Sequence, residues 1–592
     1  MKKKMHLILQ GYQFIFRGAG REACFMLLLK CVYGIAPFCN AWLMSRFTDL
    51  LQRGTAGRAL DYLAYLAVFQ LFMMLASVLN NYVNSLYYNK ILMYSYAFLA
   101  EKVQHISSEY FEVEENQRKI DYITGNAIWA PFRIFNVSMN VVQASICLVS
   151  FLFFIFRSNG LITVFFLAAI LLYMAISGRQ GQKTYSLSND LQDRERQVKN
   201  LSSILYETKY AKELRVYQYG EYLIRIWKDL MLSLIRPRLR LSTKNSIARN
   251  CYRIGLNMFL LMYFVAIGVG ISKGVMTAGM LSAMAAYVAD LNYAIGTLGG
   301  FMEMMGENVE LLAVLFDYVK EIEGQERHGT MCFSDSGLSG GFRGEIRIRN
   351  LSFSYPNTDK AVLKDINLDI KSGEHIALVG KNGAGKTTLA YLLAGVYRPT
   401  AGDIYIDGVN IASLRSGELS RHIAMVSQKI QRFSLSLEDN IILGRTGRQN
   451  DMDELLSDMG LGDVVHSLEH GRKEMLGKEF GKTDLSGGEW QKLALARCFA
   501  FEKEIYLLDE PTSALDPHME HRLFRLFEKY SRNKTSVIIS HRLGAIRQCD
   551  RICFLEDGRI VNMGTHDELM AECPDYARLY HAQAKWFRKE GE

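Results

Sequence analysis

The chain has 592 residues, of which 49% are hydrophobic and only 22% are charged, and its formal net charge is +8. This length exceeds one domain, since domains usually hold ~100–200 residues, and the low share of charged residues excludes an ordinary soluble protein. The basic balance does not by itself indicate nucleic acid, because the cytoplasmic loops of membrane proteins carry the same excess. Ten cysteines without CxxC spacing give no sign of a disulfide framework or a metal site.

The first 21 residues are basic and only intermittently apolar. They lack the continuous hydrophobic region and small-residue cleavage site of a signal peptide. We predict an amphipathic helix on the membrane surface ahead of the first span.

Six apolar segments follow, each about long enough to cross a bilayer, which takes roughly 20 residues. They are 25–44, 62–79, 137–156, 161–176, 254–271 and, more weakly, 280–298. Polar residues inside a span usually face a cavity or a partner. Asp290 and Asn292 in the sixth segment are therefore hypothesised to line a substrate path, as is Lys30 in the first unless it only snorkels.

Two long loops, between the second and third spans and between the fourth and fifth, are rich in Lys and Arg, whereas the connections on the other side are short. Because positive charge stays on the cytoplasmic side, both long loops and both termini are predicted to be cytoplasmic. The loops are too long for turns and too polar for lipid, so we expect helices that extend beyond the membrane.

The composition changes after the sixth span. Residues 324–344 are rich in Gly and Ser and predict a linker. The tetrapeptide LSGG occurs in it at 338–341 and again at 485–488; no amphipathic helix follows the first copy, which we attribute to the composition of the linker. Strand patterns at 345–355, 366–370 and 402–407 begin a soluble α/β region. The predicted domains are 1–323 (transmembrane), 324–344 (linker) and 345–592 (nucleotide-binding).

The strand predicted at 375–379 runs directly into GKNGAGKT at 380–387, the full GxxxxGK[ST] pattern. Glycines let backbone N–H groups wrap phosphates, and the following helix start favours negative charge. Lys386 is predicted to reach the outer phosphates and the Thr387 hydroxyl to bind Mg²⁺. The predicted nucleotide-binding residues of this loop are Gly380, Asn382, Gly383, Gly385, Lys386, Thr387 and Thr388.

A second chemical signal is the apolar run 505–508, which ends in Asp509 and Glu510. Such a run predicts a buried parallel strand that delivers carboxylates to the sheet edge where ligands bind. Asp509 is suited to hold Mg²⁺ and Glu510 to act as the general base for the attacking water. In isolation two acids after a strand indicate only a solvated loop; their place after the GxxxxGK[ST] loop favours the catalytic interpretation.

These motifs, in this order, resemble the ATPase domain of ABC transporters, and the whole chain is similar to an exporter-type half-transporter of that family. The resemblance implies a multi-domain fold, with an all-α six-helix transmembrane domain before an α/β P-loop domain. It further implies ATP and Mg²⁺ as cofactors and a dimer as the working form.

Carried over residue by residue, the resemblance assigns five further features. Tyr355 matches the aromatic residue that stacks on adenine. Gln428 matches the glutamine that links the metal site to the membrane domain, which places it among the catalytic and metal-contacting residues. Residues 513–516 match a segment at the dimer seam, and His541 matches the histidine that contacts the γ-phosphate. The signature residues, which serve the γ-phosphate held by the partner subunit, are Ser486, Gly487 and Gly488.

One position departs from the family pattern, because Glu489 stands where glutamine is usual. A helix start tolerates an acid, yet the carboxylate would lie close to another subunit's phosphates. We expect activity to survive with an altered rate.

The membrane half resembles the family more loosely. Residues 274–279 match the outer turn into the last span, and 109–126 and 207–221 match the loops that carry coupling helices, the second reaching the partner's ATPase domain. A polar surface loop without special role is the alternative for both.

Cargo is indicated only by resemblance. Trp490 and the residues before the signature are similar to peptidase-less exporters of lantibiotics and related peptides, and about 24 residues ahead of the first span cannot fold a peptidase. The expected function is ATP-driven peptide export across the cytoplasmic membrane by a dimer, more readily a homodimer than a heterodimer. The alternatives are a lipid or hydrophobic drug exporter, an importer of the same architecture, an ATP-gated regulator, or a soluble mechanical ATPase, against which the spans argue. No nucleic acid partner is expected.

Overall fold

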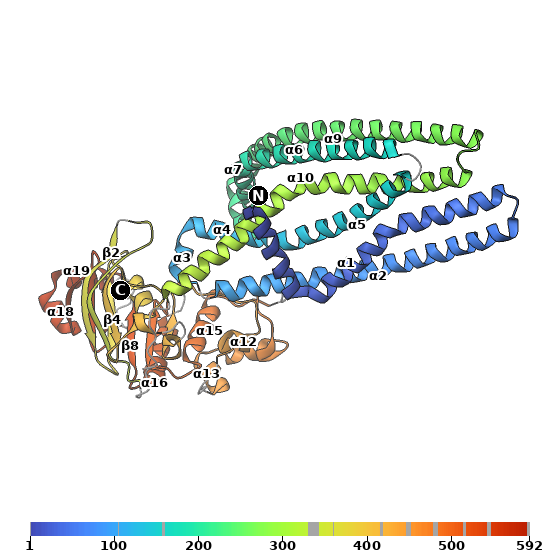
Figure 1. Ribbon diagram of the computed structural model, residues 1–592. Coiled ribbons are helices and arrows are strands. Elements are labelled where there is room, and N and C mark those ends of the chain that lie inside the picture. The colour runs from blue at the N-terminus through green and yellow to red at the C-terminus, as the bar shows by residue number, and fades with distance from the viewer. Residues whose placement is uncertain are drawn as a thin grey trace. The chain divides into compact units, whose positions relative to one another are not determined.

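The computed structural model describes residues 2–104, 106–156, 160–329, 342–358, 360–414, 418–445, 451–477, 483–512, 517–540 and 546–588 (Figure 1). It divides into two compact units. One comprises Met1–Val103 and Ile120–Glu321, and the other comprises Gln104–Lys119 and Ile322–Glu592.

The first unit is helical. Its helices are α1 (Lys2–Gln52), α2 (Ala56–Val103), the second half of α4 (Glu114–Gly125), α5 (Ala130–Phe156), α6 (Gly160–Asp190), α7 (Gln192–Tyr206), α8 (Thr208–Tyr217), α9 (Gly220–Ser272) and the larger part of α10 (Ala278–Gly329). Among the described residues, five helices are long and apolar enough to cross a membrane, namely α1, α2, the helix ending at Phe156, α6 and α9. The sixth predicted span lies within α10, a continuous helix that is not one of those five. The chain is therefore predominantly apolar helix in the region where membrane spans were predicted.

The long helices pack in pairs. Figure 1 shows α1 beside α2 and α6 beside α9, and both pairs are in contact. Much of their apolar surface stays uncovered: Met74 and Leu75 on α2 are 68% and 70% exposed. An apolar surface of this extent suits lipid or a partner chain, not water.

The N-terminal segment is helical, with one break. α1 is interrupted at Ala19, whose φ of −148° and ψ of 43° are not helical. Before that break, Phe14 and Ile15 are buried against α2 and α5, where they meet Tyr87 and Phe135. Neighbouring helices thus cover part of the apolar surface of this segment, while Met5, Leu9 and Phe16 stay exposed.

The second unit contains two sheets. The four-stranded antiparallel sheet has the order β2-β1-β4-β5, and the six-stranded sheet has the order β10-β9-β3-β8-β7-β6. In the second sheet all neighbours pair in parallel except β10 with β9. The strands are β1 (Ile346–Ser354), β2 (Ala361–Ile370), β3 (His375–Gly380), β4 (Ala401–Ile406), β5 (Val409–Asn410), β6 (Ile423–Val426), β7 (Ile505–Asp509), β8 (Thr535–Ile539), β9 (Arg551–Glu556) and β10 (Arg559–Gly564).

The helices of the second unit cover these sheets. They are α3 (Ser108–Glu112), α11 (Lys386–Leu393), α12 (Leu437–Ile442), α13 (Met452–Asp458), α14 (Gly462–Ser467), α15 (Gly487–Phe499), α16 (Pro517–Tyr530), α18 (His566–Glu572) and α19 (Pro574–Arg588). One core lies between the two sheets around α11, and a second joins α12, α13 and α15 to the outer strands of the large sheet. All five residues of β7 are buried, as an apolar run in a parallel sheet requires.

Candidate nucleotide-binding site

Four predicted motifs follow strands that end at one edge of the large sheet. The parallel register aligns Val426 of β6 with Leu508 of β7, and Ile539 of β8 with both Leu378 of β3 and Asp509 of β7. The chain segments after these strands therefore emerge together at the carboxyl edge, where open α/β sheets bind ligands.

The loop between β3 and α11 holds Lys386 at its centre. The Lys386 ammonium donates hydrogen bonds to the backbone oxygens of Gly380 (2.8 Å) and Lys381 (3.0 Å), and the residue is 6% exposed. Burial lowers the pKa of Lys386, while the charges of Glu510 and Asp509 act in the opposite direction. The loop thus encloses a positive charge. The phosphate oxygens of a bound nucleotide can replace the two backbone carbonyl oxygens as partners of the Lys386 ammonium.

Glycine is required at two positions of this loop. A Cβ atom on Gly380 would lie 2.0 Å from the carbonyl oxygen of Leu555, where nothing can give way. Gly385 has a φ of 98°, and its Cβ would lie 2.6 Å from Leu363 Cδ2. At both positions the backbone approaches a neighbouring strand too closely for a side chain. Only glycine therefore fits there.

Asp509 and Glu510 are neighbours in sequence but occupy different environments. Asp509 is 1% exposed, and neither carboxylate oxygen has a hydrogen-bond partner among the described residues. Burial raises the pKa of Asp509, an effect that the nearby Thr387 hydroxyl and Lys386 ammonium only partly offset. Glu510 is half-exposed and can meet water. The two environments suit a buried metal ligand beside a solvent-facing base.

The backbone of Glu510 is held in an unusual conformation. Its φ is 47°, in the left-handed region, and its N–H donates to the carbonyl oxygen of Ile539 at 2.9 Å. Gln428 Nε2 donates to Glu510 Oε2 at 3.1 Å. Such a conformation costs of order 1–3 kcal/mol and persists only where surrounding contacts impose it, which is common in catalytic sites.

The donor set at this edge fits Mg²⁺. Asp509 offers two buried oxygens without partners, and the Thr387 side chain is close enough to influence its ionisation. Among the described residues no cluster of three or more His, Cys, Asp or Glu could form a metal cage. Mg²⁺ sites in nucleotide enzymes need none, because one or two protein oxygens and the substrate phosphates suffice.

Tyr355, which follows β1, is positioned by the α11 helix and by other aromatic rings. Its hydroxyl lies 3.0 Å from Thr388 Oγ1, and its ring meets Phe353 and Tyr397 edge-on at 5.1 and 5.7 Å. The half-buried ring therefore lies beside the first turn of the phosphate-loop helix.

The signature residues form the start of α15. Ser486 is its N-cap: the Ser486 hydroxyl accepts from Glu489 N–H at 3.3 Å, and the Glu489 carboxylate accepts from Ser486 N–H at 2.7 Å. This reciprocal pair is a capping box, a motif that accepts either glutamate or glutamine in its last position. The Glu489 carboxylate therefore fixes the position of Ser486 through its backbone N–H, while Ser486 and Gly487 remain exposed.

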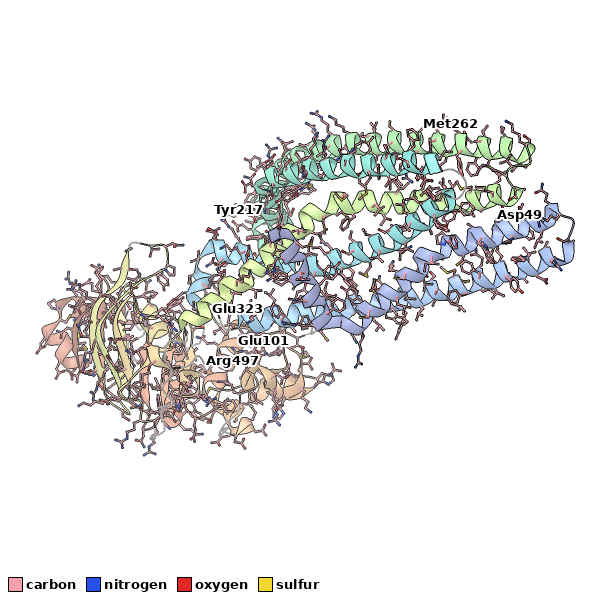
Figure 2. All side chains as sticks on the ribbon, in the orientation of Figure 1. Asp49, Glu101, Tyr217, Met262, Glu323 and Arg497 are labelled. Carbon is pink, nitrogen blue, oxygen red and sulfur yellow. The ribbon has the colours of Figure 1, made fainter. Side chains whose placement is uncertain are left out.

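Two residues that sequence reasoning missed connect α15 to the site. Gln491, 2% exposed, donates from Nε2 to the carbonyl oxygen of Pro511 at 2.7 Å. Arg497, labelled in Figure 2, donates to the backbone and side-chain oxygens of Asn440 and to Gln431, three residues after Gln428. Polar residues on a helix usually face solvent, so nothing in the sequence distinguished these two.

Trp490 is a core residue of this unit. It is 1% exposed, and its Nε1–H donates to Asp484 Oδ1 at 3.0 Å. Its likeness to peptide exporters therefore reflects packing behind the signature, not contact with cargo. His541 and residues 513–516, also predicted site residues, lie outside the described residues.

The capping box leads to a prediction about the unusual signature residue. Glu489→Gln should leave the ATPase rate within about twofold of the original, because glutamine completes the same box. Glu489→Ala removes the reciprocal bond, which typically costs ~1 kcal/mol at an N-cap, and should slow hydrolysis several-fold by loosening Ser486. Steady-state ATPase assays of the three full-length proteins compare them. A glutamine variant as slow as the alanine variant would show that the negative charge itself matters.

Comparison with known proteins agrees with this geometry. The ABC transporter family model matches residues 363–513. Nisin transport ATP-binding protein NisT of Lactococcus lactis subsp. lactis is 26% identical over 96% of this chain and 95% of its own length. Subtilin transport ATP-binding protein SpaT of Bacillus subtilis is 28% identical over 81% and 78%, respectively.

Lipid transporters are similar as well. An ATP-dependent lipid A-core flippase of Chromobacterium violaceum is 26% identical over 86% of this chain and 85% of that protein. The structure of a bacterial Atm1-family ABC exporter with ATP bound matches with a TM-score of 0.73 and 22% identity, covering 96% of this chain and 98% of that one. That likeness shows the fold.

Fold and site together define a multi-pass membrane protein with an ATPase domain that couples hydrolysis to transport. Residues 363–513 match the ABC transporter family, and the chain as a whole has the fold of an Atm1-family ABC exporter, in which a helical membrane region precedes one ATP-binding domain. The predicted family, fold class and enzyme class are confirmed.

Proposed function

We propose that this chain exports a peptide across the cytoplasmic membrane as a dimer, using ATP bound at the edge of the large sheet. The observation that carries the peptide assignment is the similarity to the nisin and subtilin transport proteins, which extends through the helical region and not only the ATPase domain. Cargo is selected in the membrane helices. The likeness to NisT covers 96% of this chain, against 86% for the lipid A-core flippase at the same 26% identity, and this wider coverage favours the peptide exporters.

In this proposal the residues of the sheet edge divide the work. The 380–387 loop and Lys386 bind the phosphates, Tyr355 stacks on adenine, and Thr387 and Asp509 hold Mg²⁺, which neutralises phosphate charge when bound. Glu510 accepts the proton of the attacking water, and Gln428 orients its carboxylate. His541 of the same chain contacts the γ-phosphate, and Ser486, Gly487 and Gly488 serve the nucleotide of the partner subunit.

Coupling to the membrane region is assigned to α3, which lies in the same compact unit as the ATPase domain although it comes between two membrane helices in sequence. Glu112 Oε1 accepts from the Tyr397 hydroxyl at 2.6 Å, and Glu109 accepts from the backbone N–H of Arg398. Tyr397 is buried, and its ring contacts that of Tyr355, the proposed adenine-stacking residue. Tyr397 therefore connects α3 to the nucleotide site. Movement of the nucleotide site would reach α3 by this route.

Tyr397→Phe tests this coupling. It removes the hydroxyl that Glu112 accepts while keeping the ring contacts, at a cost of about 1 kcal/mol because Glu112 is exposed. We expect the ratio of cargo-stimulated to basal ATP hydrolysis to fall at least about threefold. Tyr405→Phe, a partly buried tyrosine of β4 in the same unit, is the matched control and should not change that ratio. Equal ratios in both variants would exclude this bond as a coupling contact.

The second cytoplasmic loop supplies a candidate contact with the partner chain. α8 leaves Val216 and Tyr217 74% and 67% exposed, and the rings of Tyr217 and Tyr219 are stacked with centroids 5.8 Å apart. Figure 2 shows Tyr217 at one end of the helical unit and Asp49 at the other. We assign this aromatic end to docking on the partner's ATPase domain, and the end at Asp49 to the outer side of the membrane.

The cargo assignment is tested with the purified protein in proteoliposomes. A leader-bearing modified peptide should stimulate ATP hydrolysis and accumulate inside inside-out vesicles, whereas lipid A and hydrophobic drugs should do neither. Stimulation by lipids or drugs, with none by the peptide, would favour the lipid or drug exporter. Uptake only into right-side-out vesicles would indicate import.

A further inference from the structure

A polar cavity lies within the helical unit, between α1, α2, α5 and α10. Its volume is about 230 Å³, and the polar side chains that line it include Tyr33, Asn40, Gln70, Gln143 and Asp290. All four helices belong to one compact unit. Binding sites for whole small molecules usually measure ~300–1,000 Å³, so this cavity has room for one side chain of a larger ligand.

Asp290 is the only charged residue among those that line the cavity. It sits in an apolar stretch of α10 and is half-buried, and no described residue pairs with its carboxylate or donates a hydrogen bond to it. The two other polar residues singled out in the spans lie elsewhere: Asn292 donates to Asn257 Oδ1 at 3.1 Å, and neither it nor Lys30 lines the cavity. An unpaired carboxylate at membrane depth is costly and is retained for function.

The remaining polar groups of the cavity include several oxygens that can accept hydrogen bonds from a cation. Asn40 Oδ1 accepts from Gln70 Nε2 at 3.3 Å and has a second lone pair, and the Gln143 amide adds another oxygen. Pro37, which also lines the cavity, has no N–H, so the carbonyl oxygen of Tyr33 lacks its usual donor within the helix. The Tyr33 hydroxyl is buried without a partner. The cavity thus combines one negative charge with several unsatisfied oxygens.

This arrangement selects a nitrogen cation over a metal ion. An ammonium carries three N–H donors and one positive charge, which match a carboxylate and neighbouring amide oxygens, and the Tyr33 and Tyr293 rings can add cation–π attraction. Hard metal cations require about six oxygen ligands, usually with more carboxylates. We propose that the cavity binds one basic side chain of the transported peptide, with its ammonium on Asp290. The peptide as carrier of that group rests on the proposed function.

The cavity is tested directly with n-hexylammonium and, as its uncharged twin, 1-hexanol. Both are titrated calorimetrically into the full-length protein in phosphatidylcholine nanodiscs. Asp290→Asn should weaken hexylammonium binding at least tenfold and leave hexanol binding unchanged. Asp317→Asn, an exposed aspartate on the same helix, should change neither. Equal binding of hexylammonium to the Asp290→Asn protein, or equal binding of the two probes to the original protein, would overturn the proposal.

Loss of binding in the Asp290→Asn protein could also result from misfolding, so a second variant is chosen that is expected to gain affinity. Asn40→Asp puts a second carboxylate on the same cavity and should tighten hexylammonium binding severalfold; unchanged or weaker binding counts against the site.

A peptide pair separates this inference from the proposed function. A leader-bearing peptide with one lysine should stimulate ATP hydrolysis more than its acetyl-lysine twin, and Asp290→Asn should remove the difference. If neither peptide stimulates hydrolysis but hexylammonium binding depends on Asp290, the peptide function fails and the cation site stands. If both peptides stimulate equally in both proteins, the function stands and the cation site fails.

Discussion

Replacing Glu510 by glutamine is expected to reduce ATP hydrolysis at least about 100-fold while ATP still binds, because a general base contributes 10²–10⁴-fold to such a rate. The amide has nearly the same shape, so the left-handed backbone and the contact with Gln428 can persist. What is lost is the ability to accept a proton from water. Phosphate release and binding of a fluorescent ATP analogue, measured on the same full-length sample, separate the two effects.

The same variant reports on assembly. If each site needs the signature of a second chain, the Glu510→Gln protein should remain as an ATP-bound closed dimer, detectable by cross-linking of its ATPase domains. Glu469→Gln, an exposed residue far along the sequence from every site motif, is the matched control and should hydrolyse ATP normally. Retention of more than a tenth of the original rate in the Glu510→Gln protein would mean that another group is the base.

Asp509→Asn is expected to impair the enzyme and to stabilise it when no nucleotide is bound. Burial disfavours the charged form of the Asp509 carboxylate, and the Thr387 hydroxyl beside it offsets this only in part. A buried polar group that is not fully satisfied costs about 1–3 kcal/mol. Asparagine removes that charge but also the carboxylate that we propose binds Mg²⁺. We expect ATP hydrolysis to fall at least about 100-fold and the nucleotide-free unfolding temperature to rise by roughly 2–4 °C for each kcal/mol regained.

The stabilisation should depend on pH in a defined direction. Burial raises the pKa of Asp509 in the folded protein. Below the ordinary pKa of aspartate the carboxyl is neutral in both the folded and the unfolded state and does not change the free energy of unfolding. As the pH rises from there through the raised pKa, the unfolded chain ionises more readily and the folded state loses stability. The advantage of asparagine should therefore be full near neutral pH and shrink in acid.

Thermal unfolding at several pH values measures this dependence, with Asp463→Asn, an exposed substitution of the same kind in α14, as control. An unfolding temperature that is unchanged or lower at neutral pH in the Asp509→Asn protein would show that the carboxylate has a stabilising partner in the folded state.

Much of the ATPase domain could be predicted from sequence because its signals are local. The apolar runs that became β3 and β7 need only their own burial to be recognised, and the glycines after β3 are required by contacts with backbone. The membrane helices were recognisable for a similar reason, since a span needs only length and apolarity. The parallel edge that gathers Gln428, Asp509 and the phosphate loop follows from the general behaviour of such sheets.

Other features depend on contacts between distant residues and had no local signal. Glu489 looked like a charge directed at a partner's phosphate, whereas its carboxylate is used by Ser486 N–H. Trp490, part of the resemblance to peptide exporters, is packed in the core, which the sequence did not indicate. The N-terminal helix packs Phe14 and Ile15 against α2 and α5, a contact that its sequence did not indicate.

The sequence by itself determined the order of the two regions, the chemistry of the nucleotide loop and the acids that serve it, because each is encoded in a few consecutive residues. Only the tertiary structure decided which residues join α3, a segment from between two membrane helices, to the ATPase domain, namely Glu112 and Tyr397. Only the structure placed Asp290 of α10 in a cavity with Asn40 of α1. Those pairs are 285 and 250 residues apart along the chain, and which partner a buried polar group meets at such separation is set by packing, not by its neighbours in sequence.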